Sequence, residues 1–179
     1  YLFHERDGGE YRVTEVEKLV NNEFNRKIEN INDLILAIYR RNGRIVHWAD
    51  MGGGHALAQR QVAGGQLSRN VSCTNVDLFE RNDDEIRPDE AEYIAKYYGY
   101  TLTPDNKPNF IKANVENVKL PNSADIITSI ESLQYLNNPL LAICNWYNQL
   151  SQNGLVFVST ETNWSPWIRS DNRQNPVMP

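Results

Sequence analysis

Short apolar runs alternate with helical patterns over most of this chain, and that alternation is the strongest constraint on its fold. Five runs are short, apolar and without strict polar alternation: 44–49, 71–79, 108–113, 124–130 and 154–160. Segments with helical spacing separate several of them: 55–63, 87–99 and 138–154. Strands that alternate with helices indicate βαβ crossovers and a parallel sheet covered on both faces. We therefore predict an α/β fold, with a doubly wound, mostly parallel sheet in a three-layer αβα arrangement.

Two amphipathic helical patterns precede the first predicted strand. The first begins at Thr14 and Glu17, which form a possible capping box. The second starts near Asn32 or Asp33, either of which can cap it, and Gly43 ends it. We therefore divide the chain into three parts: an N-terminal helical segment (1–43), a core (44–160) and a polar tail (161–179).

The last helical pattern and the two cysteines add expectations about burial. Apolar residues of the 138–154 pattern fall mostly on one side, which we expect to be the buried one: Leu140, Leu141, Ile143, Cys144, Tyr147 and Leu150. Cys73 and Cys144 are both predicted to be buried. Two lone thiols suit a reducing compartment, so we expect a cytoplasmic protein. Three scattered histidines and no Cys/His cluster indicate no metal site.

Three consecutive glycines lie between the first predicted strand and the helical pattern that follows it. The strand runs to Asp50, and Gly52, Gly53 and Gly54 come where the chain must turn sharply. Glycine permits the positive φ angles of such a turn, and it has no side chain to keep a ligand away from the backbone. The helix behind the loop supplies unpaired N–H groups. The sequence therefore predicts a ligand site at the carboxyl end of the sheet.

An acid near the end of the second predicted strand indicates the class of ligand. Asp77 lies about 20 residues beyond the glycines, where a carboxylate can accept both hydroxyls of a ribose. Glu80 lies close by and stays open as the alternative. The dinucleotide pattern G-x-G-x-x-G has Leu57 at its last position, and Asp50 would repel a pyrophosphate but attract a cation. These two residues argue against the alternative of an NAD-dependent oxidoreductase.

Five stretches resemble, in order, the motifs of class I S-adenosylmethionine-dependent methyltransferases. "VHWADMGGGHA" resembles motif I, D/E-x-G-x-G-x-G, with Ala56 in place of the last glycine, and "NVDLF" resembles motif II. "IKANVENVKLP" is similar to the adenine-flanking stretch, and "SADIITSIESLQYLNNP" to the motif IV strand with its loop. "LSQNGLVFVST" resembles the entry to strand five. The resemblance covers about residues 44 to 160.

This resemblance implies a Rossmann-like sheet and S-adenosylmethionine as the cofactor. It also implies a set of cofactor-binding residues: Asp50, Gly52, Gly53, Gly54, Asp77, Asn114, Val115 and Ser129. The family has two further strands after the fifth. The polar tail does not show them, so we expect the C-terminal edge strands to be missing. Ala56 adds a methyl group near the glycine loop, which leaves open that the cofactor site has been lost.

The implied activity is methyl transfer by in-line displacement to a small-molecule or lipid acceptor. The loop after the fourth strand lacks an N/D-P-P-Y/F sequence and resembles family members that act on such acceptors. Glu131 is a candidate base, needed only if the acceptor loses a proton. A non-catalytic, partner-binding relative remains an alternative. A formal charge of −5 gives no strong nucleic-acid signal, and no run approaches the ~20 apolar residues of a membrane span. The oligomeric state is not indicated.

Overall fold

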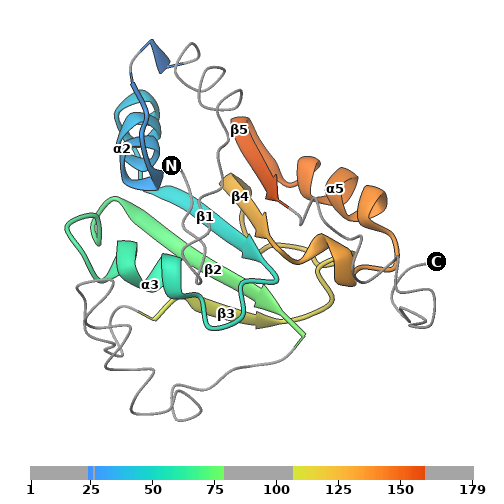
Figure 1. The fold of residues 1–179 in the computed structure, drawn as a ribbon. Coiled ribbons are helices and arrows are strands. Elements are labelled where there is room, and N and C mark those ends of the chain that lie inside the picture. The colour runs from blue at the N-terminus through green and yellow to red at the C-terminus, as the bar shows by residue number, and fades with distance from the viewer. Residues whose placement is uncertain (1–23, 26, 79–106, 160–179) are drawn as a thin grey trace, which may run out of the picture.

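The computed structural model describes residues 24–25, 27–78 and 107–159, which contain one parallel β-sheet (Figure 1). Its strands are β1 (Val46–Met51), β2 (Val71–Asp77), β3 (Asn109–Lys112), β4 (Ala124–Ile130) and β5 (Leu150–Ser159). All four neighbouring pairs are parallel, in the order β3-β2-β1-β4-β5. The predicted doubly wound α/β fold is therefore confirmed, and β1 lies two residues later than the predicted 44–49.

The strand order reverses at the centre of the sheet. After β1 the chain adds β2 and then β3 on one side, and it returns to place β4 and β5 on the other side of β1. In open parallel sheets, connections that leave neighbouring strands in opposite directions open a crevice beyond the strands' carboxyl ends. In this sheet the reversal falls between β1 and β4, so the crevice is expected beyond their carboxyl ends, next to the three glycines.

Helices cover both faces of the sheet, as a three-layer arrangement requires (Figure 1). Helices α2 (Ile31–Asn42) and α3 (Leu57–Ala63) lie over one face, and α5 (Pro139–Tyr147) lies over the other. Trp48 of β1 packs in the core on the α2 side, while Ala49 and Met51 pack in the core that contains Trp146 of α5. Alternate β1 residues thus enter opposite cores, which explains the apolar run in the sequence.

Helix α2 confirms the predicted stop signal but corrects the predicted cap. Gly43 ends the helix in the left-handed region at φ 65°, and its N–H donates to the carbonyl of Tyr39. The N-terminal cap is Asn30, not Asn32 or Asp33. The Asn30 side chain accepts a hydrogen bond from the N–H of Asp33 at 3.0 Å, so the helix begins one residue before Asn32.

The predicted boundary between the last helix and the fifth strand was wrong. Helix α5 ends at Tyr147, and β5 already begins at Leu150. An irregularity in the pairing of β5 with β4 lies between Ala124 and Ile126, and Asn153 has a φ of 60°. This bulge breaks the alternation of side chains along β5, so the first residues of the strand read as helix in the sequence.

The predicted burial of α5 was only partly right: Ile143 and Leu150 are partly buried against the core, but Leu140, Leu141, Cys144 and Tyr147 are exposed. Its buried residues are Ala142 and Trp146, whereas Leu140 is 75% exposed and Tyr147 is 70% exposed. Cys144 is exposed too, and only Cys73 is buried. Trp146 is fully buried in the apolar core, where its indole Nε1 donates a 2.7 Å hydrogen bond to the carbonyl of Val115. The side of the helix that carries Ala142 and Trp146 therefore faces the sheet.

Several sequence predictions lie outside the described residues. These are the helix beginning at Thr14, the helix at 87–99, the alternative acid Glu80 and the tail at 161–179. Within the part that the structure describes, no helix is long and apolar enough to span a membrane. In the same residues, no group of three or more His, Cys, Asp or Glu side chains is placed to hold a metal ion.

The buried carboxylate of Asp125 lies at the amino ends of the strands, opposite the end of the sheet that carries the glycine loop. Asp125 is fully buried, and the Arg44 guanidinium donates to both of its oxygens at 2.8 and 2.7 Å. Its oxygens also accept from the Ser151 hydroxyl and the His47 N–H. Burial works against ionisation of Asp125, but these hydrogen bonds outweigh it and hold its pKa below the ordinary value of 3.8. Asp125 therefore joins the starts of β1, β4 and β5.

We predict that Asp125→Asn lowers the free energy of unfolding by about 2–3 kcal/mol at pH 7, because Arg44 loses its charged acceptor. A carboxyl group with a lowered folded pKa stabilises the fold above its unfolded pKa, and this stabilisation is lost as the pH falls through the folded value. The difference between parent and variant should therefore narrow below about pH 3.8.

Urea unfolding from pH 7 to pH 2 measures this difference. Glu29→Gln is the control, because Glu29 pairs with Lys27 on the surface and its loss should have little effect. A difference for Asp125→Asn that stays constant over the whole range would contradict the assignment.

Candidate functional site

The glycine loop leaves β1 in a conformation that its neighbours dictate. Gly52 has a φ of 81°, and its N–H donates a 2.7 Å hydrogen bond to the carbonyl of Val76 in β2. A β-carbon on Gly52 would lie 2.7 Å from the β-carbon of Ser132. One on Gly53 would lie 2.5 Å from oxygens of both Asp50 and Asn75. Close packing therefore requires glycine at these two positions.

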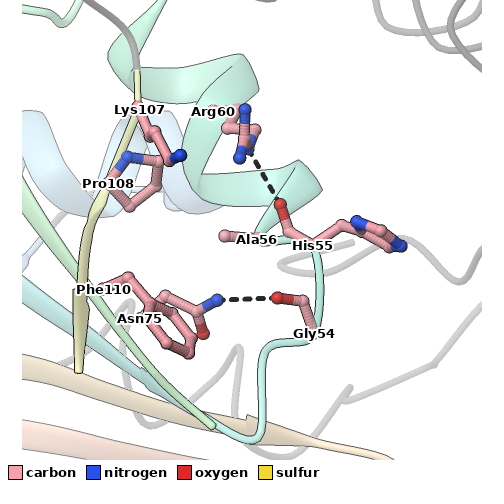
Figure 2. Close-up of a pocket in the computed structure, with 8 residues that line it drawn as sticks. All are labelled: Gly54, His55, Ala56, Arg60, Asn75, Lys107, Pro108 and Phe110. Atoms are coloured by element: carbon pink, nitrogen blue, oxygen red, sulfur yellow. Dashed lines mark hydrogen bonds between the residues drawn. The ribbon is translucent and has the colours of Figure 1, made fainter. Parts of the chain in front are cut away.

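Gly54 differs from the other two glycines because it faces open space. Its φ is 54°, and a β-carbon built there meets no described atom within 4 Å. The residue is fixed from the other side: its N–H donates to Asp77 Oδ2 at 3.0 Å, and its carbonyl accepts from Asn75 Nδ2 at 2.8 Å (Figure 2). Strand β2 thus holds the loop with its backbone close to an open volume, which is what a ligand-binding turn needs.

Asp50 is a buried carboxylate at the carboxyl end of β1. It is 9% exposed, and it forms no ion pair with any residue that the structure describes. Its Oδ1 accepts a 2.7 Å hydrogen bond from the Thr128 hydroxyl, which accepts one from the indole Nε1 of Trp48. Burial raises the pKa of Asp50 to about 6, against the Thr128 hydrogen bond, and the charge of Asp77 adds to the rise. Asp50 is therefore a carboxylate beside the crevice that no cation of the described residues compensates.

Ala56, which replaces the last glycine of the motif, takes the backbone conformation that a glycine would adopt freely. Its φ is 55°, a left-handed value that costs a non-glycine residue about 1–2 kcal/mol. Its side chain is 3% exposed. The methyl group is therefore buried against the protein, and the loop keeps its open face at Gly54.

The loop after β3 presents Asn114 and Val115 in different ways. The Asn114 carboxamide is engaged with the next residue but one: its Oδ1 accepts from the Glu116 N–H at 2.9 Å, and its Nδ2 donates to Glu116 Oε2 at 3.3 Å. Val115 is buried, and its carbonyl accepts the Trp146 hydrogen bond. The Asn114 side chain is thus turned toward Glu116, so the backbone of the loop is what remains for a ligand.

The end of β4 and the loop after it bring two serines against the glycine loop. Ser129 is fully buried, and its hydroxyl lies 2.7 Å from that of Ser132. The Ser132 hydroxyl donates to the carbonyl of Met51 at 2.9 Å, and Ser132 is the residue that packs against Gly52. Ser129, which the resemblance implied as a cofactor ligand, is therefore a buried residue whose hydroxyl is hydrogen-bonded to that of Ser132.

Glu131 stands in a strained conformation between β4 and β5. Its φ is 55°, and its N–H donates a 3.1 Å hydrogen bond to the carbonyl of Ser159 at the end of β5. Among the described residues, buried side-chain atoms without a hydrogen-bond partner include Glu131 Oε1 and Ser159 Oγ. Such strain and unpaired polar groups are concentrated at functional sites. This places Glu131 on the β5 side of the crevice, away from Asp77.

A pocket of about 280 Å³, part of it open solvent, lies beside Gly54 between α3 and β3 (Figure 2). Its lining includes the side chains of Arg60, Lys107 and Phe110. Positive side chains repel a sulfonium or ammonium group, so a cationic ligand would place its charge on the Asp50 side of the loop. The enclosed part of this pocket has room for about one water molecule, so it holds no sizeable part of such a ligand.

Some residues that shape this site were not predicted from the sequence. Asn75 and Thr128 lie within buried strands, and both make hydrogen bonds to the glycine loop or to Asp50. A polar residue inside an otherwise apolar strand is the signal that points to them. Nothing in the sequence marks Glu116, because its contacts join loops that are far apart in the chain.

Comparison with known proteins gives one family and many solved structures. The sequence model of the family described as "Methyltransferase domain" matches residues 49–158. The plantazolicin methyltransferase BpumL, solved with a desmethyl-plantazolicin analogue and S-adenosylhomocysteine, is similar over 89% of this chain and 49% of its own, at 15% identity and a TM-score of 0.52. A search of curated proteins gives no match.

Two further solved structures are more distant. An S-adenosylmethionine-dependent methyltransferase from Clostridium acetobutylicum is 16% identical, with 85% of this chain and 58% of that chain covered and a TM-score of 0.43. The N-methyltransferase NodS from Bradyrhizobium japonicum is 14% identical, with 76% and 70% covered and a TM-score of 0.43. The chain spans about half the length of the first solved chains it matches.

We predict that Asp50→Asn stabilises the ligand-free protein at neutral pH. The pKa of Asp50 is raised from 3.8 to about 6, so ionising it costs the folded state up to about 3 kcal/mol. An acid with a raised folded pKa destabilises the fold above that pKa, and the cost disappears as the pH falls toward the unfolded value. Asparagine keeps an acceptor for Thr128 and carries no charge.

Thermal or urea unfolding of parent and variant between pH 5 and pH 8 measures this effect. The gain for Asp50→Asn should be largest at pH 7–8 and shrink toward pH 5. A variant that is less stable than the parent at pH 7 would show that Asp50 is compensated in the folded state.

Proposed function

Because the chain belongs to the class I S-adenosylmethionine-dependent methyltransferase family, we propose that it transfers a methyl group from S-adenosylmethionine to a small-molecule acceptor at the crevice between β1 and β4. The observation that carries this proposal is Asp50, a buried carboxylate without a described ion-pair partner, next to a glycine loop whose outer face is open. A cationic adenosyl compound matches that combination of charge and space.

The residues present fit the cofactor. The backbone at Gly54 has room for a ligand, and Asp50 supplies a negative charge for a cation. Asp77 uses Oδ2 to hold the Gly54 N–H. A carboxylate has about four lone-pair sites, so ribose hydroxyls can bind to the same group. The Asp50 carboxylate would repel a negatively charged pyrophosphate, which argues against the alternative of NAD.

In this proposal one side of the crevice binds the cofactor and the other side binds the acceptor. Asp77 and the 114–115 loop hold the adenosine, and Asp50 holds the cationic end of the ligand. Bound S-adenosylmethionine supplies a methyl group activated by its sulfonium sulfur. Glu131 accepts a hydrogen bond from the O–H or N–H of the acceptor at its buried Oε1 and takes the proton as the acceptor attacks. Orientation of the two reactants provides most of the acceleration.

The acceptor is proposed to be a small molecule because the loop after β4 resembles that of family members that act on small molecules or lipids. Ser132 and Ser159 flank Glu131 there. The plantazolicin methyltransferase BpumL, to which this chain is similar, is named for plantazolicin. That name supports the proposal by analogy only.

Calorimetric titration with S-adenosylmethionine, S-adenosylhomocysteine and NAD tests the cofactor assignment. We predict micromolar binding of the two adenosyl compounds and none of NAD. Asp50→Asn should weaken S-adenosylmethionine binding by about 1.5–3 kcal/mol, because a charged partner is lost. Binding by the parent should also weaken as the pH falls below about 6, where Asp50 becomes protonated. Asp33→Asn, a half-buried acid in the first turn of α2, is the matched control.

Binding of NAD in place of the adenosyl compounds would overturn the assignment. Binding that is independent of pH and of Asp50→Asn would remove Asp50 from the cationic site. A parent chain that binds no adenosyl compound would favour a non-catalytic, partner-binding relative.

A second experiment tests Glu131. With a panel of small amines and phenols and radiolabelled S-adenosylmethionine, Glu131→Gln should lower the rate of methyl transfer by about a hundredfold, the scale of general-base catalysis. Cofactor affinity should stay within a factor of two, because Glu131 lies on the acceptor side. An equal loss of cofactor affinity would instead indicate that the variant disturbs the strained turn.

A further inference from the structure

We propose that Glu116 is a positioning residue, whose carboxylate fixes the 114–115 loop beside the cofactor and ties it to the loop that carries the acceptor-side residues. The inference rests on the proposed function, since it assigns a role within that site. Glu116 follows β3 at one edge of the described sheet, yet it contacts the loop that follows β4 on the other side of the crevice.

The first half of the contact fixes Asn114. Both polar atoms of the Asn114 carboxamide are used by Glu116: its Oδ1 accepts the Glu116 N–H at 2.9 Å, and its Nδ2 donates to Oε2 at 3.3 Å. The turn at 114–116 is therefore closed by a pair of hydrogen bonds between two residues. A hydrogen bond to a carboxylate is stronger than one between neutral groups, so the charge of Glu116 contributes to this closure.

The second half of the contact reaches the acceptor-side loop. Glu116 Oε1 accepts the N–H of Asn138 at 2.5 Å, and Oε2 also accepts from Asn137 Nδ2 at 3.4 Å. Asn138 is the N-terminal cap of α5, where its side chain accepts the Leu141 N–H at 3.0 Å. One carboxylate thus joins the start of α5 to the turn at 114–116.

The backbone of the same turn is fixed from the helix side. The indole of Trp146 donates to the carbonyl of Val115 at 2.7 Å, and Asn145 Nδ2 donates to the carbonyl of Glu116 at 3.3 Å. With its carbonyls held by α5 and its side chains held by Glu116, the turn has one arrangement. A ligand that contacts the 114–115 backbone then meets a preorganised surface, which lowers the ordering cost of binding.

The position of Glu116 also has a consequence for the reaction. The 114–115 loop is proposed to flank the adenosine, and the chain from Glu131 to Asn138 forms the acceptor side. Because Glu116 contacts both, a change at Glu116 should disturb cofactor binding and the rate of transfer together. A residue that acted only on the stability of the fold would change neither affinity nor rate in the folded protein.

A rescue experiment in the full chain tests this inference. Glu116→Gln keeps the size of the side chain and replaces one acceptor oxygen by a donor, which then opposes Asn114 Nδ2 or the Asn138 N–H. Calorimetry should show S-adenosylhomocysteine binding weakened about tenfold, the scale of one lost charged hydrogen bond. Adding Asn114→Asp supplies an acceptor for the new amide, so the double variant should bind within about threefold of the parent.

Two controls separate positioning from general destabilisation. Gln149→Leu removes the acceptor of the Leu120 N–H, at the far end of the segment between β3 and β4, and should lower the melting temperature without changing affinity. Asn114→Asp alone sets two carboxylates against each other and should bind no more tightly than the parent. All affinities are measured below the melting temperature of each variant.

The outcomes distinguish this inference from the proposed function. Parent-like affinity of Glu116→Gln overturns the inference and leaves the function intact. If Asn114→Asp raises the S-adenosylhomocysteine affinity by the same factor in the parent and in Glu116→Gln, the two residues act independently. That result also overturns the inference. A parent chain that does not bind S-adenosylhomocysteine contradicts the proposed function, and this inference with it.

Discussion

A buried carboxylate at the point where the strand order reverses is the constraint on which the rest of the site depends. Asp50 ends the central strand, and the fold gives it a hydroxyl from Thr128 and no described cation. Holding a charge there is costly to the ligand-free protein, as its raised pKa of about 6 shows. Proteins retain such a destabilising buried charge at functional sites. A positively charged ligand would offset the free-energy cost of ionising Asp50.

The glycine loop and Asp50 form one unit of structure. Gly53 has no room for a side chain because oxygens of Asp50 and Asn75 lie against it, and Gly52 packs on Ser132. Only Gly54 is open. Two of the three glycines are therefore required by packing, and they place the third where a ligand can approach its backbone. Loss of the last motif glycine to Ala56 is accommodated in the same loop, since its methyl group is buried.

Local patterns in the sequence predicted the sheet, its direction and the loop, because each depends on short-range features. Apolar runs indicate strands, glycines indicate turns, and an acid near the end of each of the first two strands indicates the ligand class. Contacts between distant segments could not be predicted. Trp146 of α5 is buried and hydrogen-bonded to the carbonyl of Val115, whereas Leu140 and Tyr147, which were predicted to be buried, are exposed. Because of the bulge near Asn153, β5 begins earlier in the chain than predicted. Glu116 connects two loops whose contact no local sequence pattern indicates.

The central claim is that the backbone of the glycine loop itself meets an adenosyl compound. Amide chemical shifts of ¹⁵N-labelled protein titrated with S-adenosylmethionine test it most directly. The account predicts large shifts for the amides of Gly52, Gly53 and Gly54, and little change for Gly65, which follows α3. A titration in which binding occurs but the three loop glycines do not shift, while residues elsewhere do, would contradict it.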